Sequence, residues 1–159
     1  MAKYACVRTD NMSGTIMGKD LVSLKYDGDI ENGNVLAIGD FVEGEREARV
    51  GTAPKKNTAL NKVALVATPE VVKVKQYNGL GDFINKNGDL VRGYRLISGD
   101  IFSVTKEALD GGAQIKKGAV VELKDNSTKL VAVATPTSET TTVGKIVLVE
   151  GDWYVIEVA

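Results

Sequence analysis

Short apolar runs separated by turn residues recur along the whole chain. The runs are rich in valine and threonine, and glycine, asparagine or aspartate bounds most of them. Both features are typical of β-strands, because β-branched side chains suit a pleated backbone and the bounding residues favour tight turns. The expected strands are KYACVR, DLVSLKY, NVLAIGDFV, KVALVAT, EVVKVKQY, LVRGYRLI, DIFSVT, AVVELK, KLVAVAT, KIVLVE and DWYVIEV.

The connections between these runs predict hairpins and almost no helix. The clearest turn signals are Asp27-Gly28, Asn32-Gly33, Asn78-Gly79, Asn87-Gly88 and Gly151-Asp152. The segments TKEALDGG and LGDFINKNG each predict one short helical turn, the first capped by Thr105 and stopped by Gly111-Gly112. The sequence therefore predicts an all-β fold with at most two short helical turns.

An internal repeat divides the expected strands into two sets. IENGNVLAI around Gly33 is similar to IKKGAVVEL around Gly118, an offset of 85 (118 − 33). TALNKVALV is similar to TTVGKIVLV at an offset of 83 (141 − 58), and LVSL to IFSV at an offset of 80 (101 − 21). Near-constant offsets in several blocks indicate two similar structural units.

We therefore expect two small, related lobes, each resembling a β-barrel or β-sandwich. Residues 1–70 would form the N-terminal lobe, residues 71–98 a connecting hairpin or linker, and residues 99–159 the C-terminal lobe. The alternative is a single sandwich with an inserted hairpin.

Composition excludes more classes of function than any motif does. The 159 residues include 20 basic and 21 acidic side chains, so no excess of positive charge is present to bind a nucleic-acid backbone. The absence of histidine excludes Ser-His-Asp and Cys-His catalysis and the usual zinc sites. The one cysteine, Cys6, cannot form an intramolecular disulfide. We expect it to be a small buried residue, with a reactive thiol as the alternative.

Targeting signals are not apparent in the sequence. The N-terminal MAKYACVRTD lacks the apolar core of a signal peptide. No run reaches the roughly 18 apolar residues of a membrane helix. We therefore expect a protein made in the cytoplasm of the cell that produces it, with no membrane partner.

Two acidic loops resemble calcium-binding loops without completing the pattern. In DGDIENG, Asp27 to Gly33, the glycine is one place late and the twelfth position is Ile38, which cannot supply a carboxylate. NKNGD, Asn85 to Asp89, would put Phe83 at the first ligand position. Both are better explained as hairpin turns, and no carboxylate pair has a spacing that places it across a cleft. We expect no metal, no cofactor and no enzymatic activity.

The charged stretch GEREAR, Gly44 to Arg49, has two interpretations. It is either a charged edge that binds a partner or a feature that keeps a sheet edge from pairing with neighbouring molecules. In both interpretations it lies at the end of a strand, next to an exposed loop.

Several longer blocks carry a family resemblance. They are YACVRTDNMSGTIMGKDLVSLKY, IENGNVLAIG, GERE, VALVATPEV and FINKNGDLVRGYRLISGDIFSVTKEAL. These blocks resemble small virion proteins of tailed bacteriophages, particularly phages of Gram-positive bacteria. The C-terminal IKKGAVVELKDNSTKLVAVA and TVGKIVLVEGDWYVIEV are similar to capsid decoration, or cement, proteins. Those proteins share a strand, a hairpin, a small-residue loop and a final strand pair.

The resemblance implies a non-enzymatic structural protein on the capsid surface of a virion. Its partner would be the major capsid protein of the assembled head, with a second copy of this chain as a further partner and no nucleic acid. Docking by β-augmentation through the N-terminal segment would place Lys3, Tyr4, Val7 and Arg8 against the capsid. The alternatives are a tail or baseplate component and a host-surface or carbohydrate-binding module.

Overall fold

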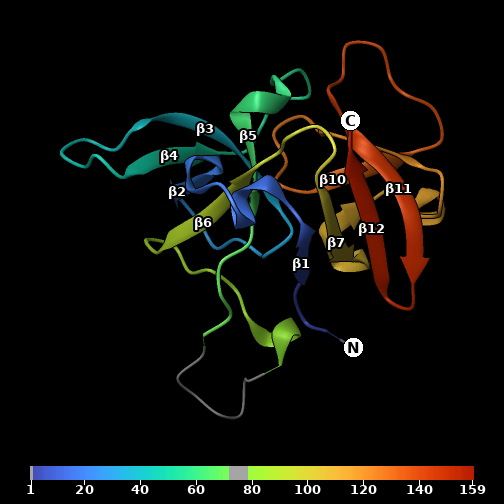
Figure 1. Ribbon diagram of the computed structural model, residues 1–159, viewed down its shortest axis with the longest axis horizontal. Helices are drawn as coiled ribbons and strands as arrows, with labels where there is room; N and C mark the ends of the chain where they lie inside the picture. Colours follow the sequence, from blue (N-terminus) through green and yellow to red (C-terminus); the bar gives the residue numbers. More distant parts are fainter. Residues whose placement is uncertain (1, 72–78) are drawn as a thin grey trace.

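The computed structural model describes residues 2–71 and 79–159. Within these residues the chain forms twelve β-strands and six one-turn 3-10 segments, and it contains no α-helix (Figure 1). The predicted all-β class is confirmed. The expected strand EVVKVKQY and the turn Asn78-Gly79 lie largely or partly outside the described residues.

The short helical turns are more numerous than the sequence predicts. Both expected turns are present, as η6 (Lys106–Ala108) and η5 (Leu80–Asp82). Four more are η1 (Ser13–Thr15), η2 (Gly18–Asp20), η3 (Leu60–Lys62) and η7 (Gly112–Gln114). Thr105 precedes η6 without capping it, because its hydroxyl accepts the backbone N–H of Cys6 at 3.1 Å. A single 3-10 turn needs no apolar periodicity, so the sequence pattern does not reveal it.

The first lobe is a closed five-stranded barrel. Its strands are β2 (Leu21–Tyr26), β3 (Val35–Phe41), β4 (Ala48–Thr52), β5 (Val63–Val66) and β6 (Leu90–Arg95), in the order β2-β4-β3-β5-β6. The interior is so narrow that a side chain would be crowded at two glycine positions on its strands. A Cβ at Gly93 would lie 2.9 Å from Cβ of Ala64, and one at Gly51 would lie 2.9 Å from Cδ1 of Leu36.

The second lobe is a seven-stranded sheet. Its strands are β1 (Val7–Asn11), β7 (Ile101–Thr105), β8 (Leu109–Asp110), β9 (Val120–Glu122), β10 (Leu130–Val133), β11 (Thr142–Glu150) and β12 (Trp153–Val158). The order across the sheet is β1-β7-β12-β11-β9-β10-β8. The sheet curls, because β8 at one end follows β7 in the chain after the single turn η6.

The two lobes have the same strand order and directions. In the barrel, β2 is antiparallel to β6 and parallel to β4, and β3 lies antiparallel between β4 and β5. In the second lobe, β7 is antiparallel to β12 and its continuation β8 is parallel to β10, while β9 lies antiparallel between β10 and β11. The second lobe therefore has the barrel's topology with its first strand interrupted by η6, and the prediction of two related lobes is confirmed.

Hydrogen bonds fix the correspondence between the lobes residue by residue. The N–H of Gly33 donates to O of Val66 at 2.8 Å, and the N–H of Gly118 donates to O of Ile146 at 2.8 Å. The glycines have the expected offset of 85 (118 − 33) and similar positive φ angles, 87° and 91°. Val66 and Ile146 are offset by 80 (146 − 66), so the alignment of TALNKVALV with TTVGKIVLV is wrong by three positions. All four residues of β5 are buried, and a fully apolar strand gives no register signal.

Two strands cross the boundaries expected from the sequence. β1 lies within residues 1–70 but pairs with β7 of the second lobe. β6 lies within residues 71–98 but closes the barrel against β2 and β5. The apolar pattern of a strand does not show which strand it pairs with, so a linear division does not capture this exchange.

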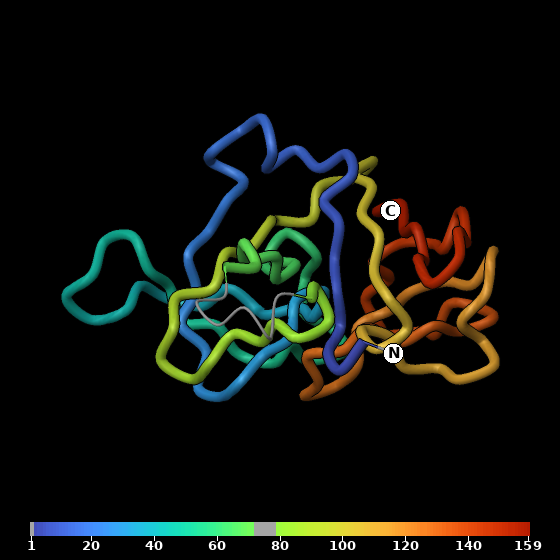
Figure 2. Tube along the Cα trace, turned by 90° about the horizontal axis from the view of Figure 1, so that it is seen from below, coloured from blue at the N-terminus to red at the C-terminus, as the bar shows by residue number. Residues whose placement is uncertain are grey.

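One apolar core joins the two lobes. Val35, Val63 and Leu65, from the outside of the barrel, pack in the same buried cluster as Phe102 and Ile146 of the second lobe. Both faces of β5 are therefore covered, since the alternate residues of β5 face the barrel interior. Backbone hydrogen bonds also cross the junction, from Val35 to Thr128, from Asn126 to Pro54 and from Thr141 to Lys56, at 2.7, 2.9 and 2.7 Å. Figure 2 shows the lobes side by side.

Candidate docking surfaces

The strand part of the predicted capsid contact is built into the fold. Val7 is only 9% exposed and packs in the core that joins the lobes. Val7 and Arg8 lie opposite Val104 and Ser103 in the β1–β7 ladder. Arg8 is exposed, and its guanidinium lies 3.9 Å from the ring centroid of Trp153. Of the two, Arg8 alone presents a side chain to a partner.

The residues before β1 are tied to the first lobe. The N–H groups of Lys3 and Tyr4 both donate to O of Gly81, at 3.0 and 2.8 Å. The next N–H, that of Ala5, donates to the Glu31 carboxylate at 2.6 Å. Lys3 is exposed, whereas Tyr4 is half-buried. This segment is therefore not a loose arm, although the Lys3 side chain remains accessible.

The outer side of β1 has limited room for an added strand. β1 is the last strand at its end of the sheet, so its outer backbone edge has no neighbouring strand among the described residues. A groove of about 180 Å³ lies along this edge, between Val7 and Thr9 of β1 and residues 67–70 of the barrel. Because residues 67–70 already approach the edge, β-augmentation there would require them to move.

The two loops that resemble calcium sites lie against each other. Ile30 and Asn85 form an isolated β-bridge, and the Lys86 ammonium lies 2.8 Å from the Asp29 carboxylate. The hydrogen bond from Lys86, helped by the N–H of Asn87, lowers the pKa of the Asp29 carboxyl. The same contact raises the pKa of Lys86. A lysine therefore occupies the position where a cation would bind, and residues 2–71 and 79–159 contain no cluster of three metal-ligating side chains.

Cys6 is buried, as the sequence predicts. Its side chain is 5% exposed and lies just before β1. Burial, reinforced by the carboxylate of Glu70, raises the pKa of its thiol. A thiol in that environment stays protonated and is a poor nucleophile.

Three aromatic rings on the described surface are covered by cations of the same chain. Arg8 lies over Trp153, Arg49 over Phe41 at 4.1 Å, and Lys3 near Tyr4 at 5.0 Å. A carbohydrate would have to displace these cations before it could stack on the rings. The three pairs therefore do not form an open stacking platform.

Three exposed apolar side chains stand on two turns in the segments that connect the lobes, although Val71, Phe41 and Leu90 are more exposed than Met17 and Ile97. Ile16 is 82% exposed, Met17 49% and Ile97 37%. We call these three residues the junction patch. Isolated exposed apolar residues are ordinary, but neighbouring ones on ordered turns are typical of interaction sites.

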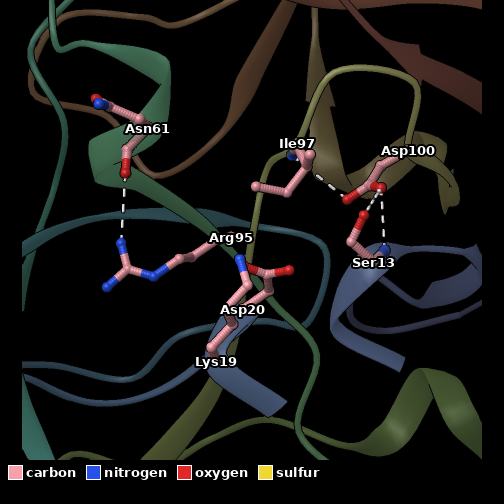
Figure 3. A network of polar contacts seen from close by, with 7 residues as sticks. All are labelled: Ser13, Lys19, Asp20, Asn61, Arg95, Ile97 and Asp100. Carbon is pink, nitrogen blue, oxygen red and sulfur yellow. Dashed lines mark hydrogen bonds and ion pairs between the residues drawn. The ribbon is translucent and has the colours of Figure 1, made fainter. Parts of the chain in front are cut away.

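A polar network holds the junction patch in place. The hydroxyl and the N–H of Ser13 both donate to Oδ1 of Asp100, at 2.7 and 3.0 Å, and the N–H of Ile97 donates to Oδ2 at 3.3 Å (Figure 3). Asp100 is only 4% exposed. Gly14 of the same loop packs closely against the Tyr94 ring, since a Cβ at Gly14 would lie 2.7 Å from Cδ1 of Tyr94. The patch is therefore presented on a preorganised base.

The two turns of the junction patch are equivalent positions of the repeat. Asp20 donates its N–H to O of Met17 at 2.9 Å, and Asp100 donates its N–H to O of Ile97 at 3.0 Å. Both pairs are related by the offset of 80 (100 − 20) that aligns β2 with β7. Sequence reasoning missed these residues. The available signal was an Ile-Met pair set among glycines and polar residues in MSGTIMGKD.

The β3–β4 hairpin is the other projecting element. It extends sideways from the barrel in Figures 1 and 2 and exposes Phe41 (54%) and Val50 (41%). The charged stretch Gly44 to Arg49 forms its tip and the start of β4. Since β4 has neighbours on both sides, β2 and β3, this stretch does not protect a sheet edge. Partner binding by this stretch stays a prediction.

Comparison with models of protein families, with curated proteins and with solved structures finds no match to this chain. In the part of the chain that the structure describes, no helix is long and apolar enough to cross a membrane.

Proposed function

We propose that this protein is a non-enzymatic structural component of a phage particle that decorates and stabilises the assembled capsid. The observation that carries the proposal is the junction patch. Its three exposed apolar side chains stand on turns that the Ser13–Asp100 hydrogen bonds anchor, in the segments that connect the two lobes. The sequence resemblance to phage decoration proteins points in the same direction.

The chemistry of the surface is compatible with this role. Among the described residues, no three metal-ligating side chains form a cluster. The net charge of −1 favours attachment through shape and apolar contact, so binding should depend only weakly on salt. Many copies on one symmetric shell would act together, so even a small contact per copy would stabilise the assembled head.

Co-sedimentation with heads tests the proposal. Purified protein is mixed with empty heads assembled without it, and with isolated capsid subunits. We expect saturable binding to heads at a fixed number of copies, no binding to subunits, and improved survival of decorated heads on heating. Absence of binding to heads at any concentration would overturn the proposal, and recovery of the protein with purified tails would favour the tail or baseplate alternative.

Paired variants test whether the junction patch is the docking face. Ile16→Ser with Met17→Ser removes its most exposed side chains, and we expect a loss of head binding. The control is Leu148→Ser with Val149→Ser on β11, which alters side chains that are 47% and 38% exposed. Equal binding by both double variants would show that another surface docks, including the N-terminal segment with Lys3 and Arg8.

A further inference from the structure

The β3–β4 hairpin is longer than the barrel fold requires. In the barrel, fourteen residues separate the paired residues Ala37 and Thr52. In the second lobe, eight residues separate the equivalent pair Glu122 and Val131. The repeat thus provides an internal comparison: the same topology closes with six fewer residues (14 − 8). We call residues 38–51 the arm.

The tip of the arm is acidic and exposed. Residues 43–47 read EGERE, and all five are exposed. Glu45 is paired with Lys25 at 2.6 Å, a contact between half-exposed side chains that contributes at most about 1 kcal/mol. Glu43 forms no ion pair among the described residues. The tip therefore offers two carboxylates, Glu43 and Glu45, to a cationic partner at little cost.

A groove rich in arginine lies beside the base of the arm. It has a volume of about 430 Å³ and is lined by Leu21, Val22, Ser23, Phe41, Glu47, Arg49, Arg92 and Arg95. Arg49 stacks on Phe41, but Arg92 and Arg95 form no ion pair with any described carboxylate. Within residues 2–71 and 79–159, the guanidinium of Arg95 makes one hydrogen bond, to O of Asn61 at 3.4 Å (Figure 3), and that of Arg49 makes one, to O of Gly39 at 3.2 Å. Most guanidinium donors of the groove therefore have no partner among the described residues, and carboxylates can bind them.

The same face of the barrel has the composition of an interface. Lys25 lies opposite both Val50 of β4 and Leu90 of β6, which are 41% and 50% exposed. Phe41, 54% exposed, forms one wall of the groove. Aromatic and arginine side chains are enriched at the centres of protein interfaces, and this face carries both, together with the charged Lys25 and Glu47.

We propose that the arm tip of one copy of this protein docks in the arginine groove of a second copy. Glu43 and Glu45 of one molecule would meet Arg92 and Arg95 of the other, and the incoming tip would cover Phe41 in the groove wall. Because tip and groove belong to one molecule, the contact is reciprocal, and two copies close as a symmetric pair with both grooves filled. This inference does not depend on binding to a capsid.

Charge-reversal variants test the contact without any phage component. The groove variant carries Arg92→Glu and Arg95→Glu, and the tip variant carries Glu43→Lys and Glu45→Lys. The control carries Lys116→Glu and Lys117→Glu, the same charge change as the groove variant at exposed positions of the second lobe. Circular dichroism establishes that each is folded, and sedimentation velocity from micromolar to near-millimolar concentration measures association.

We expect the wild type and the control to associate, and each reversed variant alone to bind itself at least about tenfold more weakly, because like charges then meet. An equimolar mixture of the groove and tip variants should associate again, since each tip then meets a groove of opposite charge. High salt should weaken the wild-type pair. A wild type that stays monomeric throughout, reversed variants that associate as well as the wild type, or a mixture of folded variants that fails to associate would each overturn the proposal.

Discussion

Replacing Leu65 by alanine should destabilise both lobes together. Leu65 lies on β5 of the barrel, is fully buried, and belongs to the core that also contains Phe102 and Ile146 of the second lobe. A buried Leu→Ala change costs about 2–5 kcal/mol, because it removes apolar contacts and leaves a cavity. At an m-value of about 2 kcal/mol/M, a loss of about 3 kcal/mol lowers the urea midpoint by about 1.5 M.

The fluorescence of the single tryptophan reports the unfolding of the second lobe separately. Trp153 lies on β12 of the second lobe, whereas far-ultraviolet circular dichroism reports both lobes. If the shared core makes one cooperative unit, the fluorescence and dichroism midpoints coincide and move together in Leu65→Ala. Leu148→Ala, at a side chain that is 47% exposed, should change the free energy of unfolding by less than about 0.5 kcal/mol. A fluorescence midpoint that stays in place while dichroism shows an earlier, separate transition would refute the single-core argument.

Three further predictions address individual residues. The pKa of the Cys6 thiol is raised in the folded protein, so the thiol's contribution to stability is full below the pKa of an unfolded thiol, near 9, and is lost at higher pH. The difference in unfolding free energy between wild type and Cys6→Ala should therefore shrink between pH 7 and 10. Ser13→Ala should cost about 1–3 kcal/mol in urea unfolding, because it removes a 2.7 Å hydrogen bond to a buried carboxylate, and Ser13→Thr should retain most of it. Gly144→Ala should prevent normal folding, judged by near-ultraviolet dichroism, because the new Cβ would collide with the backbone O of Glu157, whereas Gly18→Ala, with no atom within 4 Å of its Cβ, should still fold.

The strand pattern predicts much of the fold, because short apolar runs bounded by turn residues mark most of the strands. β3, β7, β9 and β12 all fall within runs expected from the sequence. Turn glycines were equally informative: Gly33, Gly88 and Gly151 follow or form the expected turns and have positive φ angles. These signals depend only on residues that are neighbours in the sequence, so the sequence alone reveals them.

Features that depend on distant neighbours were not predictable in this way. β4 was missed because three of its five residues are not buried, and its polar sequence resembles a loop. The pairing of β1 with β7 and the sharing of one core by both lobes depend on contacts across the whole chain. The junction patch needed two such facts, the exposure of Ile16 and the Ser13–Asp100 hydrogen bond.

The pairing of β1 with β7 sets an order of events during translation. The barrel strands end at Arg95, so the first lobe can close before the second has been synthesised. Val7, by contrast, meets its partner Val104 across 97 positions (104 − 7). At about 5–20 residues per second, roughly 5–20 s pass between the synthesis of these two residues. β1 is thus the first strand to leave the ribosome, and it has no partner strand until β7 follows it out after all five barrel strands.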